Sequence, residues 1–258
     1  MRFAVCIKQV PDTESKIKLK SDGSNIDSAG VKWVINPYDE HAIEEAIKLR
    51  DANAGSQVLV FTVGPKTRVG EALRTALAMG ANEAIAIDAP DQLDSSLTAQ
   101  ALAAALKKEG SFDFVLTGKL AIDDNAACVS QMLAHELNIP HATVISKLTM
   151  AGSLLTVERE IEGGTKQILE LTLPALISAN KGLNIPRYAS LPGIMKAKTK
   201  IIKDYSLADL GIDIGQMRVK YSQFKLPPEK PPVKMLDGDI AKKVHDLAML
   251  LREEAKVI

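Results

Sequence analysis

The sequence predicts an α/β protein with three layers, α/β/α, in which helices cover both faces of a mostly parallel sheet, followed by an extended C-terminal arm. Up to about residue 138, apolar runs of strand length alternate with longer segments of helical period, as in repeated β-α-β units. The 258 residues are 46% hydrophobic, which is enough for one sizeable core. From about residue 205 the chain turns proline-rich and then amphipathic, which indicates the arm.

The first elements are a strand and a helix on either side of a polar excursion. Residues 2–10, RFAVCIKQV, form the apolar run of a buried strand, and SDGSN supplies the turn of a hairpin-like excursion. NPYDEHAIEEAIKLRDA then predicts a helix in which Asn36 caps the first turn and Pro37 needs no hydrogen-bond donor. Asp39 and Glu40 suit the positive end of the helix dipole.

Further strands and helices alternate along the next part of the chain. Glycines stop two of these helices, and serines at the start of the second are expected to cap it. The predicted strands are 56–64, 83–88 and 112–118, and the predicted helices are 68–81, 95–110 and a segment within 119–137.

After about residue 138 the pattern changes to shorter alternating segments. ATVISKLTM, LLTVEREI, KQILELTL and PALISAN are typical of an antiparallel extension or a continuation of the sheet. The tail carries the polyproline-prone KLPPEKPPVK and the amphipathic GDIAKKVHDLAMLLREEAK. The predicted domains are therefore 1–204, the α/β domain, and 205–258, an arm and helix that reach a partner.

Composition excludes several classes of function. The 32 basic residues match the 32 acidic ones, so no overall field favours nucleic acid or an anionic membrane. Apolar runs are too short for a membrane span. Cys6 and Cys128 lie far apart without a CxxC, which fits a reducing compartment and argues against metal ligation. No Ser/His/Asp or Cys/His set proposes a bond-breaking reaction, so the chain is not expected to be an enzyme.

Four segments are expected to outline one nucleotide-sized crevice, because ligands of open parallel sheets bind beyond the carboxyl ends of the strands. Neither a G-x-G-x-x-G fingerprint nor a GxxxxGK[ST] loop is present, so the common phosphate-binding motifs are excluded. The segments are Cys6–Lys8, Asn36–Asp39, Thr62–Pro65 and Gly118–Asn125.

GKLAIDDNAACVSQM, residues 118–132, is the most informative of these segments. Gly118 allows close backbone approach at a strand end, and Asp123 or Asp124 can cap the following helix. The small Ala126 and Ala127 would leave its first turn open for an anion. An ordinary strand-to-helix turn with a good cap fits the same spacing.

Together these motifs resemble the β subunits of electron transfer flavoproteins, nearly end to end. The resemblance implies a Rossmann-like, adenine-nucleotide-binding domain with AMP as a structural ligand. It also implies a heterodimer in which the α subunit carries the redox-active FAD near the interface. The motifs that carry it are AVCIKQVPD (4–12), NPYDEHAIEEA (36–46), ALRTALAMGA (72–81), GKLAIDD (118–124), VEREIEGG (157–164) and LNIPRYASLPGIMKAK (183–198).

Carried over position by position, the AMP site coincides with the crevice outlined by the strand ends. Relatives that bifurcate electrons bind a second FAD here, typically with a DGDTAQVGP-like loop, whereas this chain has DDNAACVSQ, which favours AMP. Cys128 replaces the usual Gln, and Ser130 replaces the usual Gly. The implied site residues are Cys6, Asn36, Pro37, Tyr38, Asp39, Val63, Lys119, Ala121, Ile122, Asp123, Asp124, Asn125, Ala126, Ala127, Cys128, Val129 and Ser130.

Residues 183–200 resemble the family's recognition loop for acyl-CoA dehydrogenases. There Leu191 would insert into a hydrophobic pocket of the dehydrogenase, and Glu160 would pair with an arginine of the docked enzyme. Ile185 replaces the usual glutamate, which makes the loop more positive. The other implied docking residues are Pro192, Ile194, Met195 and Lys196, with Lys198 and Lys200 helping to steer acidic partners.

The resemblance implies an electron carrier in fatty acid β-oxidation. Electrons would pass from acyl-CoA and related dehydrogenases to the α-subunit FAD and on to a quinone oxidoreductase. Two alternatives stay open: a bifurcating subunit with its own FAD, and a nucleotide-binding regulatory module that forms a homodimer. The absence of an Arg-rich presequence favours a bacterial cytoplasm, or the mitochondrial matrix if the source is eukaryotic.

Overall fold

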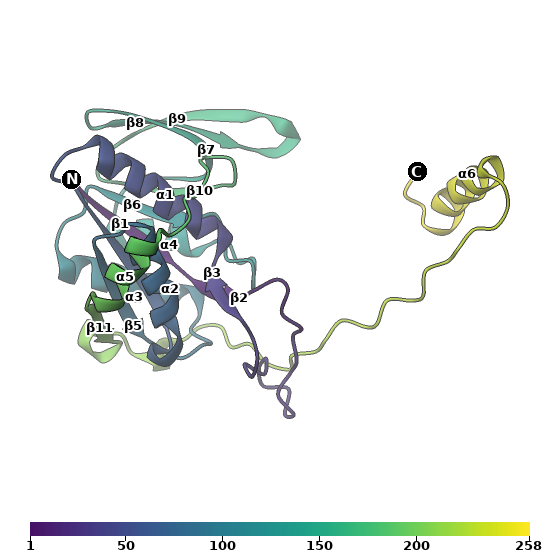
Figure 1. Ribbon diagram of the computed structural model, residues 1–258, viewed down its shortest axis with the longest axis horizontal. Coiled ribbons are helices and arrows are strands. Elements are labelled where there is room, and N and C mark those ends of the chain that lie inside the picture. Colours follow the sequence, from purple (N-terminus) through teal and green to yellow (C-terminus); the bar gives the residue numbers. More distant parts are fainter. The chain divides into compact units, whose positions relative to one another are not determined.

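The computed structural model describes residues 1–258 and confirms the α/β class (Figure 1). Its main sheet has nine strands in the order β11-β5-β4-β1-β6-β10-β7-β8-β9. The seven strands from β11 to β7 run parallel to one another, β8 is antiparallel to β7, and β9 is antiparallel to β8. The strands are β1 (Arg2–Ile7), β4 (Gln57–Gly64), β5 (Glu83–Asp88), β6 (Phe114–Gly118), β7 (His141–Ala151), β8 (Leu154–Glu160), β9 (Lys166–Thr172), β10 (Ala175–Ala179) and β11 (Ile202–Ser206).

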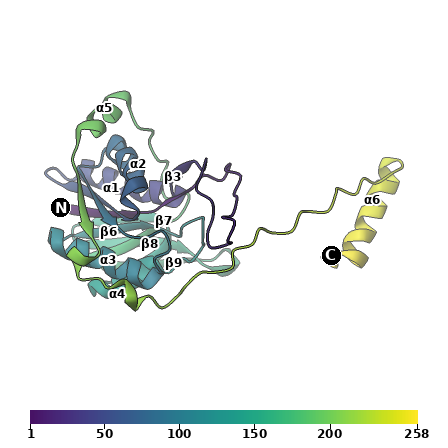
Figure 2. The ribbon, with the colours of Figure 1, turned by 90° about the horizontal axis from the view of Figure 1, so that it is seen from below.

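Helices cover both faces of the parallel part of the sheet, so the three predicted layers are confirmed. One face carries α1 (Pro37–Ala52) and α2 (Lys66–Met79), and the other carries α3 (Ser95–Glu109) and α4 (Val129–Leu137). Figure 2 shows the two helical layers on opposite sides of the sheet, with α5 (Leu191–Thr199) outside α2.

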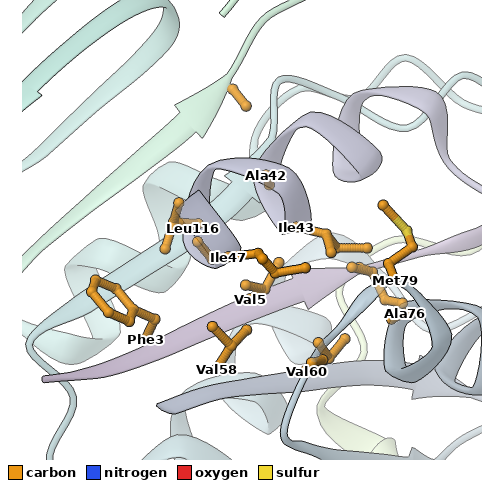
Figure 3. Close-up of a cluster of buried hydrophobic side chains, with 14 of the residues drawn as sticks. Phe3, Val5, Ala42, Ile43, Ile47, Val58, Val60, Ala76, Met79 and Leu116 are labelled. Atoms are coloured by element: carbon orange, nitrogen blue, oxygen red, sulfur yellow. The ribbon is translucent and has the colours of Figure 1, made fainter. Parts of the chain in front are cut away.

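The central strands are buried on both faces, as expected for a parallel sheet. In β1, Phe3 and Val5 face α1, whereas Ala4 faces α3 and α4. Figure 3 shows Val5 and Val58 beneath Ile43 and Ile47 of α1. Ala42, Ile43, Ala46 and Ile47 follow helical spacing and form the buried stripe of α1.

After residue 138 the sequence left open an antiparallel extension or a continuation of the sheet, and both occur. β7, β8 and β9 form the antiparallel extension. The last segment of that run, PALISAN, forms β10, which continues the parallel part of the sheet between β6 and β7. The excursion after β1 is also hairpin-like: β2 (Gln9–Pro11) pairs with β3 (Trp33–Ile35), and Leu19 pairs with Ile26.

The expected serine caps of α3 are wrong. Asp94 occupies the N-cap position and accepts a hydrogen bond from Leu97 N at 2.8 Å. Its second carboxylate oxygen accepts from the backbone N–H groups of Arg218 and Val219. A carboxylate is the stronger acceptor, and this one fixes both the helix and a distant segment.

The contact pattern divides the chain into Met1–Phe224 and Lys225–Ile258. The predicted division after residue 204 falls within β11. The second unit has no regular structure up to residue 239, and then forms α6 (Ile240–Met249), which continues as a π-helical turn (Leu250–Glu254). No helix combines the length and the apolar character needed to cross a membrane.

Candidate functional site

A cavity of about 660 Å³ lies at the carboxyl ends of β1, β4 and β6. All four segments predicted to outline a crevice contribute to its wall, among them Cys6, Asn36, Val63 and Gly118. The volume is within the range of small-molecule sites, roughly 300–1,000 Å³. The sheet topology therefore brings the predicted segments together, and their role in binding a nucleotide stays a prediction.

The buried carboxylate of Asp39 joins two of the strand ends. Its Oδ2 accepts a hydrogen bond from Lys8 N at 2.6 Å, and its Oδ1 accepts one from Gly118 N at 3.0 Å. Burial raises the pKa of Asp39 to about 7, although both backbone donors act to lower it. The sequence assigned Asp39 to the helix dipole, but its main role here is to connect β1 to β6 through the first turn of α1.

Gly118 is required by the close approach of α1 to the end of β6. A Cβ at this position would overlap Oδ1 of Asp39 and would lie 2.8 Å from the backbone carbon of Tyr38. The prediction that a glycine permits close approach at this strand end is confirmed. The approaching group within the chain is α1.

The prediction that Asn36 caps α1 with its side chain is wrong. Asn36 stands at the N-cap position without a side-chain capping bond. Its Nδ2 donates to Leu120 O at 2.7 Å and its Oδ1 accepts from Ile122 N at 3.2 Å. The amide can satisfy a donor and an acceptor together, so it fixes the loop that follows β6 instead.

Asp123 and Asp124 do not cap the next helix, because α4 begins only at Val129. Their carboxylates pair with Lys8 Nζ at 2.9 and 3.0 Å. Burial alone would lower the pKa of Lys8, but these carboxylates raise it. The pairs therefore fasten the loop to the end of β1. Ala126 and Ala127, expected in the first helical turn, lie in the loop before it.

The first turn of α4 faces the cavity with Val129 and Ser130 in its wall. Cys128 holds the N-cap position and makes no side-chain cap, so the N–H groups of this turn are available to an anion. Ser130 Oγ lies 2.7 Å from Thr117 Oγ1, which anchors the turn to β6. On the cavity floor, burial raises the pKa of the Cys6 thiol, with a smaller contribution from Asp39.

Most of the predicted site residues line the cavity, and three do not. Pro37 is exposed at the start of α1, Tyr38 lies beneath the Lys119 ammonium at 5.9 Å, and Asn125 has a φ of 53° in the loop. Those in the wall are Cys6, Asn36, Asp39, Val63, Lys119, Ala121, Ile122, Asp123, Asp124, Ala126, Ala127, Cys128, Val129 and Ser130.

Sequence reasoning missed a second part of the wall. The guanidinium of Arg68 lies 3.6 Å from the centroid of the Trp33 ring, and both residues line the cavity with Tyr221 and Phe224. Arg68 stands in the first turn of α2, so the strand-end argument could have found it. Tyr221 and Phe224 belong to a segment without regular structure. No pattern in the sequence indicates where such a segment lies in the fold.

The second half of the predicted recognition loop, residues 183–200, is a helix. Ser190 caps α5 by accepting a hydrogen bond from Gly193 N at 3.1 Å, and Pro192 occupies its first turn, where no donor is needed. The side chains of Leu191 and Met195 are 80% and 65% exposed, and Ile194 is 38% exposed. The proline therefore lies at the start of a helix, within a segment that the sequence analysis described only as a loop.

The charged residues assigned to docking do not all lie on α5. Glu160 is exposed at the end of β8, 3.5 Å from Asn180 Nδ2, and Lys196 and Lys198 lie in the last turn of α5. The ammonium of Lys200 is held against the chain, because its Nζ donates to Ala81 O and to the backbone oxygen of the next residue, each at 2.9 Å.

Comparisons with known proteins agree with these features. The model of the electron transfer flavoprotein domain matches residues 24–210. The chain is 42% identical over 262 aligned residues to the electron transfer flavoprotein subunit beta of Bacillus subtilis (strain 168), and the alignment covers both chains in full. It is 39% identical over 261 residues to the mitochondrial subunit beta of Oryza sativa subsp. indica, again over both full chains.

The human electron transfer flavoprotein subunit beta is 38% identical over 261 residues, which is 100% of this chain and 99% of the human one. Such identity over the whole length also covers the strand ends and α5. The chain therefore belongs to the electron transfer flavoprotein family and is similar throughout to its β subunits.

Proposed function

We propose that the chain holds AMP as a structural ligand in the cavity beside the loop after β6. The site fits a mononucleotide in its chemistry. Uncapped N–H groups of α4 and the small Ala126 and Ala127 offer a place for the phosphate, and apolar Val63 and Leu102 offer a slot for the base. AMP supplies no redox chemistry. The chain's own residues bind and orient it and thereby fix the loop.

We infer that the redox-active FAD lies in an α subunit, near the interface of a heterodimer. Only 4% of the residues are aromatic, so this chain could enclose a flavin ring only poorly. The amphipathic α6 supports a partner, since Ile240, Val244 and Leu247 are exposed at helical spacing. In this role no side chain of the chain has to form a bond with substrate, and the chain acts as a subunit of an electron carrier.

The electrons would come from acyl-CoA dehydrogenases that dock on α5 and would leave to a quinone oxidoreductase. The observation that carries docking is the exposed apolar face of α5, formed by Leu191, Ile194 and Met195 and bordered by Lys196 and Lys198. An apolar centre with a charged rim is typical of a transient protein interface. The lysines favour an acidic partner and a rate of encounter that falls with salt.

Leu191→Ala tests the docking role. Burying a leucine side chain in a partner contributes about 1.5–3 kcal/mol, which corresponds to roughly a tenfold to 150-fold change in affinity. We therefore expect the KM of an acyl-CoA dehydrogenase for the heterodimer to rise by that factor, with unchanged flavin content. The measurement is steady-state reduction with the heterodimer concentration varied.

A matched control removes a similarly exposed apolar side chain elsewhere. Ile168 on β9 is 66% exposed, and Ile168→Ala should leave the KM unchanged. Equal kinetics of the Leu191→Ala variant and the wild-type protein would exclude docking through this residue.

One observation favours the alternative of a second FAD in this chain. The cavity continues past the proposed AMP site to Trp33 and Arg68, whose stacked planar groups could form one wall for a larger ligand. The homodimeric regulatory module makes a different prediction, namely a stable chain without an α partner. Co-expression with a candidate α subunit, followed by counting the FAD and AMP released on denaturation, separates these cases. A homodimeric module does not co-purify with the α subunit, and two FAD molecules per heterodimer identify a second FAD in this chain.

A further inference from the structure

The stem, defined as residues 183–190, lies between β10 and the docking helix α5 and has no regular secondary structure. Even so, its Arg187 is held firmly against α1. Arg187 Nε and Nη2 donate to the carboxylate of Glu44 at 2.7 and 3.0 Å, and its backbone N donates at 3.2 Å. The Glu44 side chain is only 7% exposed. A buried carboxylate needs such a partner, so this ion pair depends on the position of the stem.

A second set of hydrogen bonds fixes the beginning of the stem. Asn184 Nδ2 donates to His41 O at 2.9 Å and to Glu45 Oε2 at 2.8 Å. These two acceptors determine the orientation of the amide, so Asn184 Oδ1 faces His41 Nδ1 at 3.1 Å and the imidazole donates from that nitrogen. Glu45 is as deeply buried as Glu44.

The helix that follows the stem, α5, packs closely against α2. A Cβ on Gly193 would overlap the carbonyl oxygen of Ala78, so only glycine allows α5 to lie this near to α2. Ala197 is buried against α2, and the Arg74 guanidinium donates to the carbonyl oxygens of Ala197 and Lys200. Figure 2 shows α5 lying alongside α2.

These attachments contrast with the opposite side of the same segment. Ile185 is 91% exposed and Tyr188 is 97% exposed, and they alternate in sequence with the anchored Asn184 and Arg187. In the sequence, the exposed apolar residues of α5 follow directly. The polar side chains of the segment are thus bound to α1, whereas its apolar side chains face water.

We propose that Arg187 and Glu44 are positioning residues that hold the stem and α5 in their docking conformation before a dehydrogenase arrives. The proposal rests on the docking role proposed above for α5. Neither residue touches the partner. They act by ordering the segment in the free protein, so that binding does not have to order it.

The test combines a double variant with a conservative one. The double variant, Glu44→Met with Arg187→Met, removes the ion pair without leaving a buried charge. The conservative variant, Arg187→Lys, keeps the positive charge but loses the bidentate hydrogen bonding to Glu44. In the co-purified heterodimer, we expect the double variant to raise the KM of the dehydrogenase for the heterodimer at least tenfold, with kcat unchanged. Arg187→Lys should give an intermediate KM. Hydrogen exchange of residues 183–199 should become faster in the same order.

The control is Leu106→Val, which lowers stability on the opposite face of the sheet. It should leave both the KM and the exchange of residues 183–199 unchanged, and an equal rise in KM would overturn the proposal. A normal KM in the double variant, while Leu191→Ala raises it, would overturn the positioning role alone. A normal KM in Leu191→Ala would overturn docking through α5 and the positioning role with it.

Discussion

Replacing Asp39 by asparagine should change how the stability of the protein depends on pH. Asp39 is 5% exposed and accepts backbone hydrogen bonds from Lys8 and Gly118. An asparagine keeps one acceptor oxygen and turns an N–H group toward the other donor. One buried N–H group then loses its partner, which costs about 1–3 kcal/mol.

In the wild-type protein the stability falls with rising pH, because the buried Asp39 carboxylate must ionise. Burial raises the pKa of Asp39 from its ordinary value of 3.8 to about 7. Between these values the folded state binds more protons than the unfolded state, so stability is fully present below the lower value and falls as pH rises to the upper one. From about pH 5.5 to about pH 8, the loss amounts to roughly 2 kcal/mol.

The amide that replaces the carboxylate does not titrate. The stability of the Asp39→Asn variant relative to the wild-type protein should therefore rise by about that amount over the same range of pH. The measurement is urea unfolding of both heterodimers at matched concentration and saturating nucleotide, repeated across the range of pH. A constant difference between the two proteins would contradict the reasoning. It would mean that the two backbone donors outweigh burial and keep the carboxylate ionised throughout.

Three further changes test other parts of the site. Gly118→Ala should destabilise the heterodimer by about 1–3 kcal/mol and release its nucleotide, because the new methyl group overlaps Asp39, and unchanged thermal unfolding would contradict this. Asp123→Asn with Asp124→Asn should change stability by less than about 1 kcal/mol, because these ion pairs are partly solvated, yet should release AMP faster on gel filtration. Equal retention of AMP by the variant and the wild-type protein would contradict a role of these ion pairs in holding the nucleotide. Deleting residues 226–258 should weaken the heterodimer in sedimentation, and an unchanged dissociation constant would show that the arm does not bind the α subunit.

The sequence predicted the parallel sheet and the meeting of strand ends because both follow from hydrophobic period and from topology. The run from β1 to α4 alternates clearly, so the position of the cavity followed from the order of its elements. The sequence could not predict which partners the individual polar side chains bind. Asn36 and Asp124 have typical capping chemistry, but each finds a partner that is distant in sequence.

The same limit applies to residues 183–200. Proline and lysine there are compatible with a bent loop or with the first and last turns of a helix, and only tertiary contacts decide between them. Gly193 against Ala78 and Arg187 against Glu44 are contacts between segments far apart in the chain. No local sequence pattern indicates these contacts, so they are visible only in the structure.

Counting the nucleotides released on denaturation of the purified heterodimer tests the central claim most directly. Chromatography against standards gives FAD and AMP per dimer. One FAD and one AMP are expected if the cavity beside the Lys119–Ser130 loop holds a structural mononucleotide and the redox flavin belongs to the α subunit. Two FAD molecules and no AMP would contradict that division of roles.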